Sequence, residues 1–313
     1  RVDAISSDIT WNNLETALFP QSVITGNSPG VYKQLWTGLF FSRGLITQDG
    51  LTSRCGRFAI QWCELYEQVA TTGTYLPEQV ALLKNSSPIS VTKNISAPTL
   101  LMAGQADSLF PISQADATYN QIKLANPQTP VKMIWHSGGH DGGSPETTRL
   151  NTLTQDWFDA NLKKTKDLNT DFEVTFASQS ITGSGREQVG PNISVSNNYT
   201  PLGQTLNQVA LLGPPQQILA PAGGLPAGIS TYPGIGSAGG FLTQQIPGQF
   251  AIFQTEPVTQ SQQILGSSQI SLLVSSQDLG VTNATLFASL QIVSASGSTL
   301  LPNGLVSPVK LDQ

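Results

Sequence analysis

The chain has 313 residues, 39% of them hydrophobic, so it is long enough for about two domains that each have a core. Its net charge is −5 and its longest basic stretch is Lys163-Lys164-Thr165-Lys166, which argues against nucleic acid as a partner because phosphate neutralisation needs a concentrated basic face. No apolar run approaches the roughly 20 residues of a membrane-crossing helix, so no membrane span is expected.

Charged residues make up 11% of the chain, against about 25% in an average soluble domain. The surface must therefore be polar but uncharged, with Gln, Asn, Ser and Thr in that role. Such a composition favours an extracellular or cell-envelope protein. The sequence begins at Arg1, without a Met or an apolar leader, which we interpret as a mature or cleaved piece.

The first third of the chain predicts helices. After a short strand near Ile5, apolar residues recur at near-helical spacing from Trp11 to Phe19. A second helical pattern covers about 31–88, where large apolar residues repeat three and four positions apart. We therefore expect a strand that leads into a helix, followed by a mainly helical segment.

Cys55 and Cys63 are the only two cysteines of the chain. On a straight helix they would lie about 12 Å apart, too far for a disulfide, so pairing requires a bend such as one at Gly56. A disulfide and two free thiols both remain open. No CxxC or His cluster stands nearby, so neither a metal site nor a cofactor is expected.

The middle of the chain alternates strands and helices. Residues 97–104 and 130–135 are short continuous apolar runs, which are typical of strands buried on both faces of a parallel sheet. Helical patterns follow them at 111–125 and 145–162. Strand, helix, strand, helix within about 70 residues predicts an α/β fold with right-handed crossovers.

The pattern changes beyond Lys166, where apolar residues alternate with a period of two, as at 172–176, 270–274 and 286–292. We expect an α/β domain over 1–166 and a β-sandwich of jelly-roll type over 167–313 that stops before its final strands.

The candidate catalytic residues follow the two predicted parallel strands. Asp107 lies after the first strand, and His140, in the glycine-flanked Ser137-Gly138-Gly139-His140-Asp141, lies after the second. Catalytic groups of open α/β sheets gather at the carboxyl ends of strands. An acid followed by a histidine in this order is what the triad of an α/β hydrolase requires. His136 is interpreted as structural, and Asp116 and Asp141 are weaker acid candidates.

No GxSxG sequence, the usual setting of the serine nucleophile, occurs in the α/β section. The nucleophile comes first in chain order in this arrangement, so we expect it upstream of Arg1. The alternative is that Asp107 caps the helix near Pro111 and His140 is a loop residue without a partner.

The segments APTLLMAGQADSLFP and WHSGGHDGG resemble the acid and histidine motifs of the X-Pro dipeptidyl peptidase and cocaine esterase family of α/β hydrolases. The resemblance implies that Asp107 is the triad acid and His140 the general base, that 31–88 forms a helical cap, and that 251–311 belongs to a C-terminal jelly-roll. It further implies cleavage of a small ester or peptide through an acyl-enzyme. The N-terminal remainder of the same protein would then be a partner of this chain, because it would carry the nucleophile.

Two matters stay open at this level. Trp11 lies where such a family brings the chain past the active-site mouth, so it is a candidate substrate-binding residue, although a core aromatic explains it as well. Trp36, Phe40 and Phe41 of the predicted cap are candidates for lining an acyl or leaving-group pocket, although the spacing of a helix explains them as well. The rival hypothesis for the whole chain is an extracellular structural or binding protein on a degenerate hydrolase scaffold, with a homo-oligomer as one form.

Overall fold

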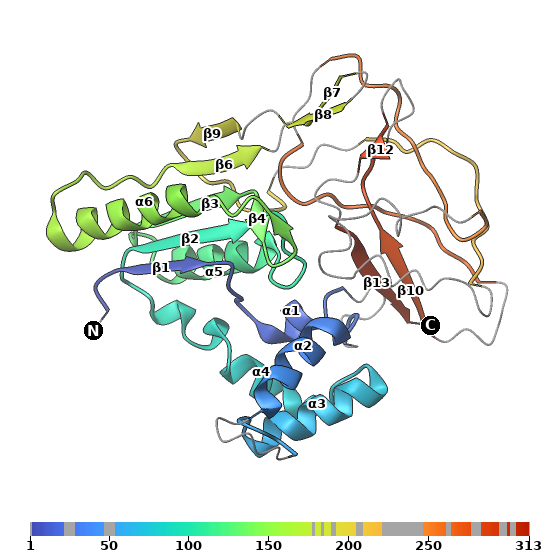
Figure 1. Cartoon of the computed structure of the whole chain (residues 1–313), viewed down its shortest axis with the longest axis horizontal. Coiled ribbons are helices and arrows are strands. Elements are labelled where there is room, and N and C mark those ends of the chain that lie inside the picture. The colour runs from blue at the N-terminus through green and yellow to red at the C-terminus, as the bar shows by residue number, and fades with distance from the viewer. Residues whose placement is uncertain are drawn as a thin grey trace.

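The computed structural model describes residues 2–21, 29–46, 54–176, 179–182, 185–188, 192–204, 209–220, 247–260, 264–276, 283–293, 299–300 and 305–312. Its centre is a five-stranded sheet in the order β1-β2-β3-β6-β9 (Figure 1). Strands β1 (Ile5–Asp8), β2 (Thr99–Gly104), β3 (Val131–His136) and β6 (Phe172–Phe176) run parallel, and β9 (Asn192–Ser196) is antiparallel to β6. The fold of this part of the chain is mixed α/β.

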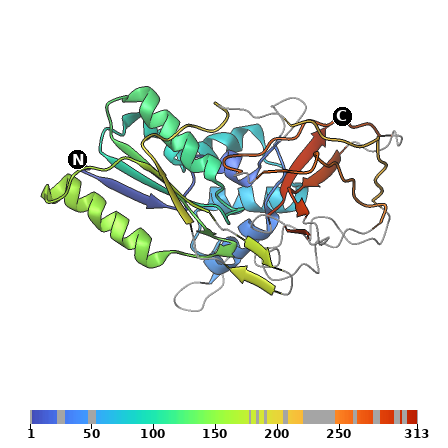
Figure 2. The ribbon, with the colours of Figure 1, turned by 90° about the horizontal axis from the view of Figure 1, so that it is seen from above.

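The two central strands are buried on both faces, as their continuous apolar runs predict. A hydrophobic core lies on each face of the sheet. Alternate residues of each strand pack into opposite cores, because successive side chains point to opposite faces. Leu101 and Met133 pack with Ile122 of α5 (Ile112–Ala125), whereas Leu100 and Ile134 pack with helix α6 (Thr147–Phe158). Figure 2 shows α5 and α6 on the two sides of the sheet.

The predicted helical segment is helical over most of its described residues. Helix α1 (Leu14–Leu18) is followed by α2 (Gln34–Leu45), α3 (Ile60–Thr72), α4 (Val80–Asn85) and short 3-10 turns at Pro77–Gln79, Pro88–Ser90 and Thr92–Asn94. A core of its own, centred on Phe19, Leu65 and Leu83, holds α1, α3 and α4 together. None of the described helices is long and apolar enough to cross a bilayer.

Cys55 and Cys63 form a disulfide with their Cα atoms 5.3 Å apart. The straight-helix distance does not apply, because Cys55 precedes α3 and the chain turns at Gly56, whose φ of +51° is one that L side chains rarely adopt. Of the two alternatives that the sequence left open, the structure has the disulfide.

The strand at 172–176 was assigned from sequence to the all-β segment, and this assignment is wrong. Strand β6 pairs in parallel with β3, through Ile134 with Glu173 and Trp135 with Val174. Period-two alternation indicates a strand with one buried face, but it does not say which sheet the strand joins. The domain boundary at 166/167 stays a prediction, although a strand beyond it completes the first sheet.

The described residues after β6 do not show a jelly-roll. Apart from β9, their strands form three separate two-stranded sheets, from β7 (Gln179–Thr182) with β8 (Gly185–Gln188), β10 (Asn283–Ala288) with β13 (Ser307–Asp312), and β11 (Ile292–Val293) with β12 (Thr299–Leu300). Residues 270–274 pair with no strand in the described part of the chain, and their apolar side chains are exposed, so the structure shows no strand where one is expected. The expected sandwich therefore stays a prediction.

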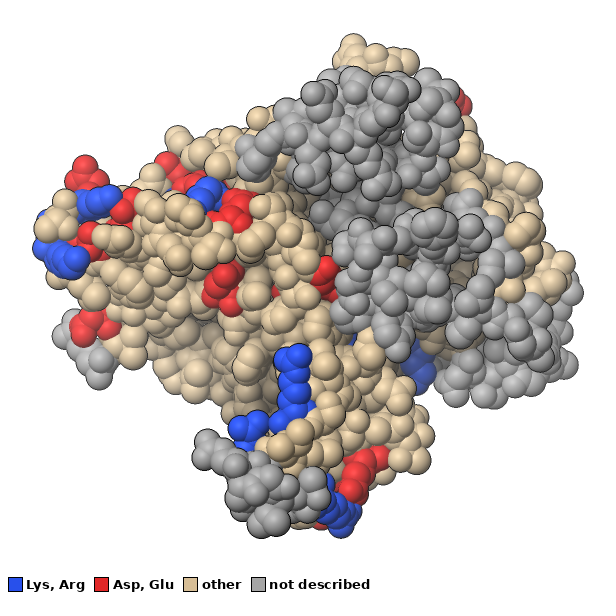
Figure 3. Space-filling model, in the orientation of Figure 1, with Lys and Arg blue, Asp and Glu red and all other residues tan. Residues whose placement is uncertain are grey.

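The low charge of the chain is visible on the surface. In Figure 3 most of the described surface on this face is uncharged, with acidic and basic side chains scattered over it.

Candidate active site

The carboxyl ends of β2 and β3 lie side by side, with Gly104 opposite His136 in the parallel register. The loops that follow are joined by backbone hydrogen bonds, from Ala106 N to the Gly138 oxygen (3.1 Å) and from Asp141 N to the Ala106 oxygen (3.0 Å). A Cβ atom at Gly139 would lie 2.1 Å from the Ala106 oxygen, so this approach requires glycine. The glycines around His140 thus bring its loop onto the loop of Asp107.

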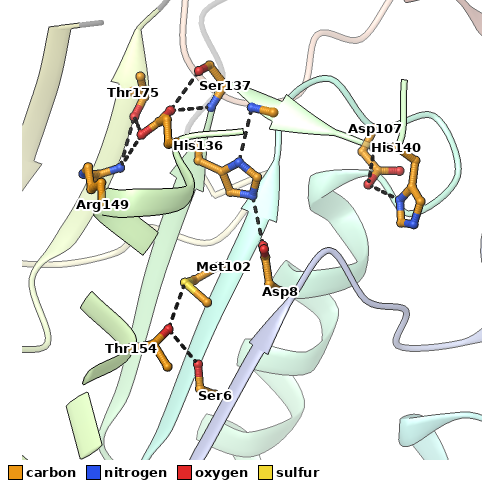
Figure 4. Close-up of polar contacts among 12 residues, drawn as sticks. Ser6, Asp8, Met102, Asp107, His136, Ser137, His140, Arg149, Thr154 and Thr175 are labelled. Atoms are coloured by element: carbon orange, nitrogen blue, oxygen red, sulfur yellow. Dashed lines mark hydrogen bonds and ion pairs between the residues drawn. The ribbon is translucent and has the colours of Figure 1, made fainter. Parts of the chain in front are cut away.

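Asp107 and His140 meet as the sequence predicts. The His140 Nδ1 atom lies 2.7 Å from Asp107 Oδ2, and the Asp107 side chain is completely buried (Figure 4). The other carboxylate oxygen accepts from the Phe110 amide at 2.6 Å. Because the carboxylate accepts the Nδ1 proton, neutral His140 has its lone pair on Nε2. The His140 side chain is 25% exposed.

The surroundings of His140 favour its charged form. The hydrogen bond with Asp107 raises the pKa of His140, partial burial opposes this rise, and the negative charges of Asp107, Asp141 and Asp8 add to it. A histidine with a raised pKa is a stronger base, and Asp107 stabilises the imidazolium that forms when Nε2 accepts a proton.

Three aromatic residues lie at or near His140. The rings of Trp36 and Phe110 meet the imidazole edge to face, with centroids 5.8 Å and 5.5 Å away. Trp11 packs against Phe110 with centroids 5.2 Å apart, and its Nε1 donates to the Ser86 oxygen. Trp11, the predicted substrate-binding residue, is therefore separated from His140 by Phe110. Its predicted role stays a prediction.

The residues next to Asp107 and His140 form a second contact that sequence reasoning missed. Both the backbone N–H and the hydroxyl of Ser108 donate to the Asp141 carboxylate, the hydroxyl at 2.9 Å to Oδ1. Lys33 and Trp36 of the helical segment reach Ser108 from the other side. The sequence signal for this contact is that a polar residue directly follows each predicted catalytic residue, Ser108 after Asp107 and Asp141 after His140.

His136 and Asp116 make structural contacts. The His136 Nε2 atom lies 3.0 Å from Asp8 Oδ1, and its Nδ1 accepts from the Gly138 amide at 3.2 Å. Figure 4 shows this buried histidine and Asp8 as a pair that is separate from Asp107 and His140. Asp116 accepts from the Tyr199 hydroxyl at 2.7 Å. Neither of the two contacts the Asp107–His140 pair in the described part of the chain.

Two further features bear on the chemistry. Within the described ranges, the hydrogen bonds of His140 go to Asp107, and no hydroxyl group donates to His140 Nε2. In the same part of the chain no group of three or more His, Cys, Asp or Glu residues is arranged to hold a metal ion. The site thus presents a partly exposed imidazole that Asp107 orients.

No protein-family model and no curated protein matches this sequence at a significant level. Among solved structures, the chain is similar to the uncomplexed acylaminoacyl peptidase of Pyrococcus horikoshii, with 19% identity and a TM-score of 0.28. That similarity covers 53% of this chain and 21% of the peptidase, so the chain spans about a fifth of that protein's length. The functional argument therefore depends on the geometry of the site.

Proposed function

We propose that Asp107 and His140 are the acid and the general base of a serine hydrolase. The observation that carries the proposal is the 2.7 Å contact between Nδ1 of a partly exposed His140 and a completely buried Asp107 carboxylate. A buried carboxylate that orients a partly exposed imidazole is the arrangement of acyl-transfer triads.

In this mechanism His140 Nε2 takes the proton of a serine hydroxyl as the serine oxygen attacks the substrate carbonyl. The same nitrogen then gives the proton to the departing alcohol or amine, which leaves an acyl-enzyme. Water hydrolyses the acyl-enzyme by the reverse sequence of proton transfers. Asp107 holds the imidazole in the Nδ1–H tautomer throughout.

In this proposal the nucleophile lies on a segment outside this sequence. The outer edge of β1 is where a strand that leads to the nucleophile would be added. Strand β1 pairs with β2 on one side and has no strand partner among the described residues on the other. Asp8 at the end of β1 lies 3.0 Å from His136 Nε2 at the end of β3, so these two strands end at the same edge of the sheet. A parallel strand added beside β1 would end at the edge of the sheet where His140 lies.

The substrate of this proposal is a small ester or peptide, as in the X-Pro dipeptidyl peptidase and cocaine esterase family that the motifs resemble. The helical segment supports a cap, because its Trp36 ring contacts His140 directly. An extracellular or cell-envelope location is part of the proposal. The Cys55–Cys63 disulfide supports it, since disulfides persist in oxidising compartments.

The test is fluorophosphonate labelling of the full-length protein followed by peptide mass spectrometry, with ester and dipeptide turnover measured in parallel. We expect one labelled serine outside residues 1–313. His140→Ala and Asp107→Asn should each lower kcat by about three orders of magnitude or more. Asp116→Asn is the matched control for Asp107→Asn, because Asp116 is a buried carboxylate away from His140.

Turnover that survives both substitutions at wild-type rates would contradict the proposal. An unlabelled, folded full-length protein without turnover would favour the structural or binding scaffold instead.

A further inference from the structure

The loop after β2 and the loop after β3 contact each other through two neighbouring pairs of residues at the candidate site. Asp107 contacts His140, and the next residues along, Ser108 and Asp141, contact each other through two hydrogen bonds. Asp141 is buried and Ser108 is partly buried. The second pair makes no contact with the reacting nitrogen, but it limits how the two loops can slide past one another.

The helical segment is fastened to the same point. Trp36 Nε1 donates to the Ser108 hydroxyl at 3.1 Å, while the Lys33 ammonium donates to the backbone oxygens of Ser108 and Leu109, the latter at 3.0 Å. The Trp36 ring then lies against the imidazole of His140. Ser108 is thus bonded at its amide, hydroxyl and carbonyl groups, to Asp141 on one side and to the start of α2 on the other.

One basic and two acidic side chains lie together at this point. Burial lowers the pKa of Lys33 to about 8, and the carboxylates of Asp107 and Asp141 oppose that fall. Burial raises the pKa of Asp141, and its hydrogen bonds from Ser108 oppose that rise. The Lys33 ammonium, which donates to the Ser108 and Leu109 backbone oxygens, therefore lies near the carboxyl groups of Asp107 and Asp141.

We infer that Lys33, Ser108 and Asp141 form a clasp that fixes His140 against Asp107 and holds the first turn of α2 over it. These three are positioning residues, and the inference rests on the proposed hydrolase function. Without the clasp, the two loops and α2 keep their own folds but lose their alignment. Misplacement by about 1 Å is enough to reduce a rate about a hundredfold.

The first experiment uses uncharged substitutions in the full-length protein. Ser108→Ala removes the hydroxyl that joins Trp36 to Asp141, and Ser108→Thr restores a hydroxyl. We expect kcat, normalised to fluorophosphonate-titrated sites, to fall about tenfold in Ser108→Ala and to recover to within about threefold of wild type in Ser108→Thr. Normalisation removes any loss that is caused by misfolded protein.

Asp141→Asn and Lys33→Met test the charged members of the clasp, and each should also lower the normalised kcat about tenfold. Their matched controls are Asp156→Asn and Lys163→Met, which change exposed residues of α6 and the turn that follows it. The controls should keep the wild-type kcat.

A readout that does not depend on activity separates the two proposals. The proton that His140 Nδ1 donates to Asp107 should give a downfield NMR resonance in the wild type, and Ser108→Ala should broaden or abolish it. If the wild type is active and depends on His140, but Ser108→Ala and Asp141→Asn keep the wild-type kcat and the resonance, the clasp is wrong and the hydrolase stands.

If the wild type neither labels nor turns over substrate, the hydrolase proposal fails, and the resonance alone decides whether the clasp positions His140. Its loss in Ser108→Ala supports the clasp in that case. An unchanged resonance overturns it.

Discussion

The two histidines of the chain hold their protons on opposite nitrogens because their partners differ. His140 donates from Nδ1 to Asp107, whereas His136 accepts at Nδ1 from the Gly138 amide and therefore donates from Nε2 to Asp8. A neutral imidazole has one donor and one acceptor nitrogen, so each partner set decides the tautomer. Both nitrogens of the buried His136 are engaged, whereas His140 is partly exposed and the described residues place no hydrogen bond on its Nε2.

The Asp107–His140 pair predicts a pH dependence of stability. The pKa of His140 is raised above its ordinary value of 6.5, so the pair stabilises the fold fully below about pH 6.5. This contribution is lost as the pH rises through the pKa of the folded state. We therefore expect the free energy of unfolding of wild type, relative to His140→Gln, to be larger at pH 5.5 than at pH 9. Urea denaturation at both pH values measures it, and a difference that does not vary with pH would contradict the prediction.

At the level of elements, a network of buried charges ties β3, β6 and α6 together. Glu173 of β6 lies 2.8 Å from Lys132 Nζ of β3 and 2.6 Å from an Arg149 nitrogen of α6, and Arg149 also contacts Glu146 at 2.7 Å. Burial raises the pKa of Glu173, but its bonds with Lys132 and Arg149 outweigh this and lower it overall. The network joins the helix and the two strands from three separate parts of the sequence.

Glu173→Gln should destabilise the protein by about 3–5 kcal/mol at pH 7, because it leaves the buried Lys132 ammonium without its counter-charge. The pKa of Glu173 is lowered from 4.5, so the stabilisation is present above that pH and is lost as the pH falls through the folded-state value. The difference between wild type and variant should therefore shrink in acid. Glu67→Gln, at an exposed pair with Arg54, is the control and should change stability far less than Glu173→Gln does at pH 7.

The disulfide links the first turn of α3, through Cys63, to Cys55 in the segment that precedes the helix. It closes a loop of 8 residues, for which the chain-entropy relation gives a stabilisation of about 2.5 kcal/mol. We expect Cys55→Ala with Cys63→Ala to lower the free energy of unfolding by about that amount. The reductant dithiothreitol should have a similar effect on wild type and none on the double variant. Equal denaturation curves for wild type with and without reductant would show that the bond makes no such contribution.

On the scale of the whole molecule, the central sheet draws on residues from both predicted domains. Phe172, Val174 and Tyr199 lie beyond 166 and are almost fully buried against Trp135 and the face covered by α5. Tyr199 also donates to Asp116 of α5 at 2.7 Å. Strand β6 and Tyr199 are thus part of the core that positions β3 and the His140 loop.

Truncation after residue 166 should therefore destroy the fold, whereas truncation after residue 204 should keep it. Loss of three buried side chains at about 1.5–3 kcal/mol each removes an amount comparable to the 5–15 kcal/mol stability of a typical domain. Circular dichroism and gel filtration of both truncated forms of the full-length protein measure the outcome. Equal folding of the two forms would place the physical boundary at 166/167 after all.

The strands at 99–104 and 131–136, the helices that follow them and the candidate pair Asp107 and His140 were predictable from local signals. A continuous apolar run can only be buried on both faces, and parallel strands place their carboxyl ends at one edge. The strand at 172–176 was predictable as a strand but not as a member of this sheet, because pairing joins residues that are distant along the chain.

The sequence by itself determined the α/β pattern, the candidate pair Asp107 and His140, and the low charge of the chain, since each follows from residue type and local spacing. Only the tertiary structure decided the Cys55–Cys63 bond, the sheet that β6 joins, and the contact of Ser108 with Asp141 and α2. Each of these depends on the path of the backbone between segments: a turn at Gly56, a parallel crossover through α6, and two loops brought together by glycine at 139. Local spacing contains no information on such distances.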